Sequence, residues 1–126
     1  MNQKIESPGA PKVLGPYSQA IKAENLIFLS GQLGLDPKTN ELKMGADVQT
    51  RQALNNLKAV LESAGCKLAN VVRCDIFLKD INDFAAVNAV YEEFFTDDPK
   101  PARRTVGVTA LPKNALIEIS CIAVAD

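Results

Sequence analysis

A long helical pattern set between strand-like segments places the strongest constraint on the fold. From about Ala46 to Ala64 apolar residues recur at three- and four-residue steps, with Asp47 near the start and Gly65 just past the end. These are the periodicity and the boundary signals of an amphipathic helix. Its apolar stripe needs a surface to cover, which the flanking strands supply in a layered domain. The stripe consists of Ala53, Leu54, Leu57, Val60, Leu61 and Ala64.

Strand patterns lie on both sides of this helix. Residues 18–23 and 26–33 form two segments separated by a tight turn, which predicts a hairpin. Residues 70–79 alternate apolar side chains with mainly polar ones, as a half-buried strand does. Residues 102–108 and 116–124 predict the last two strands.

A second helix is expected after the strand at 70–79. Asp80 or Asn82 can cap its start, and an apolar stripe continues to about Phe95 before a proline-containing segment. The resulting order ββαβαββ predicts an α+β fold, a two-layer domain with two helices on one face of a mixed sheet. No repeat, linker or low-complexity segment interrupts residues 1–126, so we expect one domain.

The sheet face opposite the helices is expected to be uncovered. Several of the predicted strands are apolar on both sides. Large exposed apolar surfaces mark interaction sites. We therefore expect the open face to meet another subunit.

Composition excludes several kinds of site. The chain has no histidine, which rules out a Ser-His-Asp triad, a Cys-His pair and a histidine metal site. Cys66, Cys74 and Cys121 lack metal-type spacing and are expected to be buried free thiols. A net charge of −1 offers no general attraction for nucleic acid. We therefore expect acid-base chemistry from carboxylates, tyrosine, lysine, backbone groups or water, and neither a metal nor a nucleic-acid partner.

The sequence carries no membrane or export signal. No segment approaches the run of about 20 apolar residues that spans a bilayer. Residues 1–6 also lack the apolar stretch of a signal peptide. The expected location is the cytoplasm.

Charged residues interrupt the last two predicted strands. Glu118 stands within Leu116–Ile119, where a charged side chain needs a partner or a chemical role. By strand alternation Arg103 shares a face with Thr105, whereas Arg104 points the other way. A guanidinium grips a carboxylate through two parallel hydrogen bonds, so an arginine near a lone glutamate suits a ligand that has its own carboxylate. The alternatives are an ion pair or an exposed edge for Glu118 and a surface position for Arg103.

Four further residues carry weaker signals. Asn88 places an amide on the apolar stripe of the second helix, where it either contacts a ligand or forms internal hydrogen bonds. Tyr17, Ser30 and Gly31 lie at turns or close backbone approaches. The two hydroxyls are either pocket groups or ordinary strand-end residues bonded to nearby backbone.

The residues singled out above fall in five ordered segments. These are Gly15-Pro16-Tyr17-Ser18-Gln19-Ala20, Leu29-Ser30-Gly31-Gln32, Thr50-Arg51-Gln52-Ala53-Leu54-Asn55-Asn56-Leu57, Val87-Asn88-Ala89-Val90-Tyr91, and Pro101-Ala102-Arg103 followed by Ile117-Glu118-Ile119. Together they resemble the RidA (YjgF) family over nearly the whole chain. The resemblance implies a fold like that of bacterial chorismate mutase and a homotrimer with ligand pockets between neighbouring subunits.

The activity implied by the resemblance is that of a 2-iminobutanoate/2-iminopropanoate deaminase. Such an enzyme hydrolyses reactive enamine and imine intermediates (2-aminoacrylate/2-iminopropanoate and 2-iminobutanoate) to 2-keto acids and ammonia, and no cofactor is implied. Arg103 matches the family arginine that holds the substrate carboxylate, and Glu118 matches the glutamate assigned to position or activate the attacking water. The other matches to pocket positions are Tyr17, Ser30, Gly31 and Asn88.

Two positions depart from the family pattern. Thr105 stands where many members carry cysteine, and it can present a hydroxyl to the substrate but cannot act as a reactive thiolate. Arg104 stands where a small residue is common and is expected to serve packing or the trimer surface. Hydrolysis needs no covalent nucleophile, so the loss of the cysteine affects the implied reaction little.

Two other functions remain open from the sequence. One is a non-catalytic regulatory module that uses the same pocket to sense a keto acid or related metabolite. The other is the endoribonuclease or translation-inhibitor activity described for some relatives. The acidic balance, the absence of histidine and the lack of a basic aromatic surface count against this second alternative.

Overall fold

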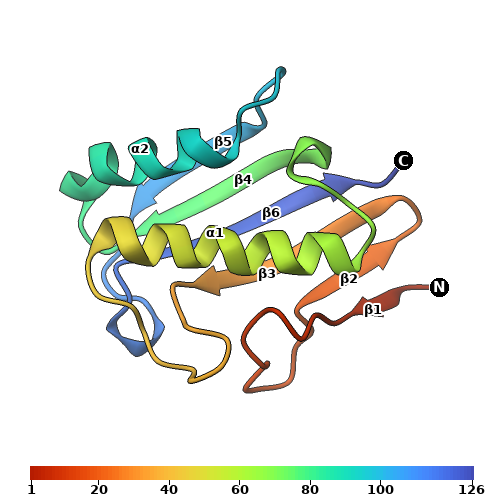
Figure 1. Cartoon of the computed structure of the whole chain (residues 1–126), viewed down its shortest axis with the longest axis horizontal. Helices are drawn as coiled ribbons and strands as arrows, with labels where there is room; N and C mark the ends of the chain where they lie inside the picture. Colours follow the sequence, from red (N-terminus) through yellow and green to blue (C-terminus); the bar gives the residue numbers. More distant parts are fainter.

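The computed structural model describes all of residues 1–126 as a six-stranded sheet with two helices packed on it (Figure 1). The strands lie in the order β1-β2-β3-β6-β4-β5. Every neighbouring pair is antiparallel except β4 and β5, which run parallel. The strands are β1 (Gln3–Ile5), β2 (Ala20–Ala23), β3 (Leu26–Leu33), β4 (Val71–Leu78), β5 (Ala102–Gly107) and β6 (Ile117–Val124).

Both helices, α1 (Ala46–Ser63) and α2 (Phe84–Phe94), cover the same face of the sheet (Figure 1). The Asp80 carboxylate accepts a hydrogen bond from the Asn82 N–H at 2.9 Å. Asp80 is therefore the cap, but of a 3-10 turn at Ile81–Asp83 that leads directly into α2. No helix is both long enough and apolar enough to cross a membrane.

The predicted order of elements was wrong in one respect, because it omitted the first strand, β1. The observed order is βββαβαββ, because β1 pairs with the edge of β2. Gln3 and Lys4 are exposed and Ile5 alone is buried, so this short segment carries too little alternation to predict a strand. The α+β class, the two helices and the mixed sheet are confirmed.

The hydrophobic core fills the space between the helices and the sheet. Leu54, Leu57 and Leu61 of the α1 stripe are fully buried, which confirms the face predicted for this helix. Alternate residues of β6 point toward the same core, while the residues between them face the open side of the sheet. The β6 residues in the core are Ile117, Ile119, Cys121 and Ala123.

The three cysteines are buried free thiols, as predicted. Cys74 and Cys121 lie opposite each other on β4 and β6 and belong to the core. Burial raises the pKa of Cys74 to about 11, so its thiol is neutral at physiological pH. These residues act as small apolar side chains.

The face of the sheet opposite the helices exposes apolar side chains. Leu26 and Phe28 of β3 are 38% and 42% exposed, and Val72 of β4 is 46% exposed. Ile122 and Val124 of β6 are partly buried on the same side of the sheet. The apolar, uncovered face expected from the sequence is therefore present.

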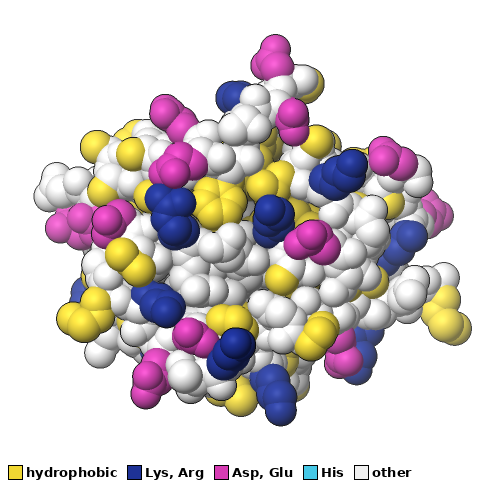
Figure 2. Space-filling model, in the orientation of Figure 1, with side chains coloured by type: hydrophobic (Ala, Val, Ile, Leu, Met, Phe, Trp, Pro, Cys, Tyr) yellow, Lys and Arg dark blue, Asp and Glu magenta, His cyan; other side chains and the backbone are white.

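The opposite, helix-bearing side has a different character. In Figure 2, which shows this side in the view of Figure 1, basic and acidic side chains are interspersed. A continuous basic surface, which nucleic-acid binding normally uses, is missing from this face.

Candidate functional site

Arg103 and Glu118 lie on opposite faces of the sheet. In the register of the strands Arg103 stands beside Cys74, whose side chain belongs to the core under the helices. Glu118 stands beside Phe77, and both alternate with core residues and face the open side. One chain therefore does not bring the two predicted site residues together. Strand alternation and register are the physical reason.

The Arg103 guanidinium rests on aromatic rings of the second helix. Its Cζ lies 4.8 Å from the centre of the Tyr91 ring and 5.6 Å from that of Phe84. The Tyr91 ring in turn stacks on Phe95 with the ring centres 4.5 Å apart. None of the ion pairs in the chain includes Arg103. Cation–π contact supports the flat side of a guanidinium and leaves the N–H groups on its edge free for a carboxylate.

A cavity of about 290 Å³ opens beside this arginine. Asn88, Arg103 and Tyr91 all line it. The structure therefore brings together two of the predicted site residues, Asn88 and Arg103. The Oγ1 of Thr105 and the Oη of Tyr91 are buried without a hydrogen-bond partner. Buried polar atoms normally have a partner, so this region has unused hydrogen-bonding capacity. The remaining lining residues are Glu92, Phe95, Lys100 and Pro101.

Gly31 provides the space that Glu118 occupies. The pairing of β3 with β6 shifts register between Leu29 and Gln32, and Gly31 lies within this irregularity. A Cβ added to Gly31 would lie 2.7 Å from Cδ and 2.9 Å from Cγ of Glu118. Burial raises the pKa of the Glu118 carboxyl above its ordinary value. The result is a half-buried, partly desolvated carboxyl group that has no ion-pair partner within the chain.

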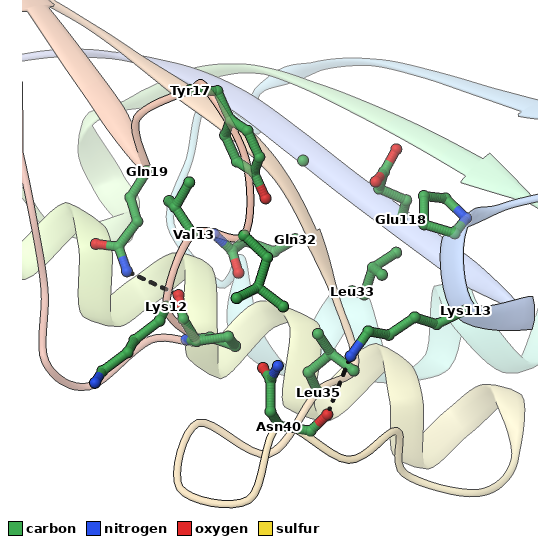
Figure 3. Close-up of a pocket in the computed structure, with 14 residues that line it drawn as sticks. Lys12, Val13, Tyr17, Gln19, Gln32, Leu33, Leu35, Asn40, Lys113 and Glu118 are labelled. Atoms are coloured by element: carbon green, nitrogen blue, oxygen red, sulfur yellow. Dashed lines mark hydrogen bonds between the residues drawn. The ribbon is translucent and has the colours of Figure 1, made fainter.

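A second cavity, of about 200 Å³, contains Glu118, Gly31 and Tyr17 (Figure 3). Figure 3 also shows Lys113 extending toward Asn40, where its Nζ donates to the backbone carbonyl at 3.4 Å. The structure therefore groups Tyr17 and Gly31 with Glu118, apart from Arg103 and its neighbours. Other lining residues include Lys12, Val13, Gln19, Gln32, Leu33 and Leu35.

Ser30 and Arg104 have partners within the chain. The Ser30 Oγ donates to the Ser18 carbonyl at 2.6 Å, which is the local backbone bond that the sequence left open as an alternative. Arg104 Nε lies 3.3 Å from the Asp75 carboxylate, which also pairs with Arg73. Arg73 and Arg104 lie on or beside the open face, and the Arg104 side chain is exposed there.

The sequence did not identify three residues that shape these cavities. Tyr91 was assigned only to the apolar stripe of its helix, although a tyrosine hydroxyl in such a stripe is itself a signal for a nearby polar group. Lys12 and Lys113 line the Glu118 cavity. Their sequence context is that of ordinary surface lysines and gave no signal.

Comparison with known proteins relates this architecture to one family. The profile of the family described as Endoribonuclease L-PSP matches residues 7–125. The 2-iminobutanoate/2-iminopropanoate deaminase of Escherichia coli is 46% identical over 126 residues, which cover 98% of each chain. The protein of the same name from Dermatophagoides farinae is 48% identical over 123 residues, 97% of this chain and 95% of the relative.

Solved structures agree with the sequence relatives. The crystal structure of RidA from the Antarctic bacterium Psychrobacter sp. superposes with a TM-score of 0.94 at 43% identity, and the match covers 97% of this chain and 98% of the other. The fold and the full-length matches define a RidA-type α+β protein. The chain belongs to the RidA/YjgF/L-PSP family, which confirms the resemblance found in its motifs.

Proposed function

We propose that this chain is a 2-iminobutanoate/2-iminopropanoate deaminase, which hydrolyses 2-imino acids to 2-keto acids and ammonia. Full-length relatives with that name support the proposal. The observation that carries it is the pairing of two incomplete half-sites: an arginine without an ion-pair partner beside one cavity and a desolvated carboxyl beside another.

The proposed active site is assembled between subunits of a homotrimer. Because Arg103 and Glu118 face opposite sides of the sheet, a complete site needs Arg103 from one subunit and Glu118 from its neighbour. Such a head-to-tail contact gives a closed ring when three successive rotations complete a full turn, as the proposed trimer requires. The exposed apolar residues Leu26, Phe28 and Val72 on the open face offer surface for this contact.

Arg103 is the proposed carboxylate clamp. The aromatic support of Tyr91 and Phe84 fixes the plane of its guanidinium, so two parallel hydrogen bonds can hold the carboxylate of the imino acid. Asn88 lines the same cavity and can hydrogen-bond to the bound molecule. The Thr105 hydroxyl, which has no partner in the chain, is a further candidate contact. Holding the substrate in this way supplies much of the rate enhancement by orientation.

Glu118 is the proposed general base. It accepts a proton from a water molecule as the water oxygen bonds to the imine carbon and the C=N π bond breaks, and it then gives this proton to the nitrogen to form a carbinolamine. The C–N bond then breaks with proton transfer from the hydroxyl, so that a 2-keto acid and ammonia leave. Burial raises the pKa of Glu118, which makes the carboxylate a stronger proton acceptor. Tyr17 and Gly31 line the same cavity and form the proposed wall around this water, while Ser30, next to Gly31, bonds to the Ser18 carbonyl.

The test is the rate of 2-iminobutanoate breakdown, with the imine generated in situ by a threonine dehydratase. We expect the wild-type protein to accelerate breakdown and Arg103→Ala to lose that acceleration, because the carboxylate clamp is gone. Arg51→Ala is the matched control, since Arg51 forms an exposed ion pair with Glu93 at 2.9 Å and exposed pairs contribute little.

A wild-type protein that gives no acceleration over buffer contradicts the deaminase proposal. In that case the same cavities are to be tested for binding of 2-ketobutanoate by calorimetry, as a regulatory module would require. Loss of activity in Arg103→Ala counts only if size-exclusion chromatography and circular dichroism show the wild-type assembly and fold.

Gly31→Ala is a second test of the same site. The added methyl group forces the Glu118 side chain to move, and a displacement of about 1 Å can cost about 100-fold in rate. We expect kcat to fall by about that factor with little change in melting temperature. Gly107→Ala is the control, because its added Cβ would meet Ile81 at an ordinary contact distance of 3.5 Å. Equal activity of the two variants would show that Gly31 does not seat Glu118.

A further inference from the structure

Helix α1 contains buried polar side chains that line neither cavity. Gln49, Thr50 and Asn56 are 3%, 1% and 0% exposed. Two of them belong to the segment 50–57, which carries part of the family resemblance but lies outside both half-sites. Burying an amide costs free energy unless its hydrogen bonds are made. The partners of these amides therefore indicate what the segment does.

Gln49 binds the backbone that leads into the strand of Glu118. Its Oε1 accepts a hydrogen bond from the Leu116 N–H at 2.8 Å, and its Nε2 donates to the Lys43 carbonyl at 2.9 Å. Leu116 immediately precedes β6, in which Glu118 is the second residue. One side chain thus ties the start of β6 to both the helix and the loop before it.

Asn56 binds the end of the strand that seats Glu118. Its Nδ2 donates to the Leu33 carbonyl at 3.2 Å and to the Leu35 carbonyl at 2.9 Å. Leu33 is the register partner of Glu118 across β3 and β6. The Asn56 Oδ1 accepts from Gln52 Nε2 at 2.8 Å, so its amide is held from both ends.

The backbone between these two carbonyls packs directly on the helix. A Cβ added to Gly34 would lie 2.6 Å from both Cα and the carbonyl oxygen of Gln49. This contact leaves no room for the end of β3 to shift toward α1. Gln49, Asn56 and Gly34 together fix the ends of both strands that surround the Glu118 carboxyl.

We propose that Gln49 and Asn56 are positioning residues for Glu118, an inference that rests on the proposed deaminase function. Apolar side chains at these positions could fill the same volume, but they would not hold the Leu116 N–H or the Leu33 and Leu35 carbonyls in place. The proposed function requires the Glu118 carboxylate at a fixed distance from the imine carbon. Arg103 rests on Phe84 and Tyr91 of α2 and takes part in none of these hydrogen bonds, so it sets substrate binding independently.

The experiment compares Gln49→Met and Asn56→Leu with Thr50→Val as the control. Thr50 is equally buried, but its Oγ1 bonds only to the Ala46 carbonyl of its own helix, at 2.6 Å. We expect both positioning variants to lower kcat about tenfold, because a partial displacement of the base costs less than a full ångström. We expect KM and the calorimetric affinity for 2-ketobutanoate to stay within about twofold of wild type, since Arg103 is undisturbed.

The control separates positioning from general stability. Thr50→Val is expected to lower the melting temperature while keeping kcat within about twofold of wild type. A positioning variant that folds and keeps the wild-type kcat overturns the inference. An equal fall in kcat for Gln49→Met, Asn56→Leu and Thr50→Val also overturns it. Failure of both positioning variants to fold assigns them a purely structural role and also overturns it.

The outcome for wild type keeps the two proposals apart. An inactive wild-type protein contradicts the proposed function itself. An active wild-type protein whose rate depends on Glu118 but not on Gln49 or Asn56 contradicts only the positioning role.

Discussion

Glu118→Gln is expected to remove turnover of 2-iminobutanoate while leaving the binding of 2-ketobutanoate nearly unchanged. Glutamine has the size of glutamate and keeps a hydrogen-bond acceptor, but its amide does not take up the proton released by the attacking water. Loss of a general base typically lowers a rate by about 10²–10⁴-fold. Arg103 lies on the other face of the sheet and still holds the carboxylate. Single-turnover kinetics and calorimetry measure the two quantities separately.

The stability of the same variant provides its control. Burial raises the folded-state pKa of Glu118 above that of the unfolded chain. The protonated form therefore favours folding at low pH, and this contribution is lost as pH rises through the folded-state pKa. At pH 7 the ionised, desolvated carboxylate opposes folding, so its replacement by a neutral amide is expected to maintain or raise the melting temperature. A lower melting temperature at pH 7 would indicate a structural role for Glu118 instead.

The helices and the central strands could be predicted because their patterns are long. The stripe of α1 repeats over several turns, β6 alternates over all of its eight residues, and β4 alternates from Arg73 to Leu78, after a register shift near its start. Residues 3–5 offer one buried side chain, and pairing with β2, rather than local pattern, makes them a strand. The class of fold could therefore be predicted from the sequence, whereas the edge strand β1 of the sheet could not.

The chemistry of the site was accessible from the sequence, but its geometry was not. Glu118 stood out because charged residues are uncommon inside an apolar strand, and Arg103 because an arginine near a lone glutamate suits a ligand that has its own carboxylate. Local alternation separated Arg103 from Arg104 correctly. It could not relate Arg103 to Glu118, because their relative faces depend on the registers of β5 with β4 and of β4 with β6. The bulge that brings Gly31 against Glu118 is likewise a property of strand pairing.

The separation of the half-sites leads to a sharp prediction for mixed assemblies. Arg103→Ala and Glu118→Gln are each expected to be inactive, because every site of the proposed assembly lacks one residue. When the two variants are unfolded together in equal amounts and refolded, a site is complete wherever an intact Arg103 faces an intact Glu118 of the next subunit. In a randomly assembled ring, half of the subunits carry an intact Arg103, and half of their neighbours carry an intact Glu118. About one quarter of the sites are therefore complete.

Refolding the mixture is therefore expected to restore activity to about a quarter of that of refolded wild type. Each variant refolded alone provides the baseline, and a double variant carrying both substitutions, mixed with wild type, shows how far one inactive subunit affects its neighbours. An active site contained within one subunit would give no restoration at all, because neither chain has both residues. Recovery of activity from nearly zero would thus show that the active site is shared between subunits. This conclusion needs no assumption about the number of subunits in the ring.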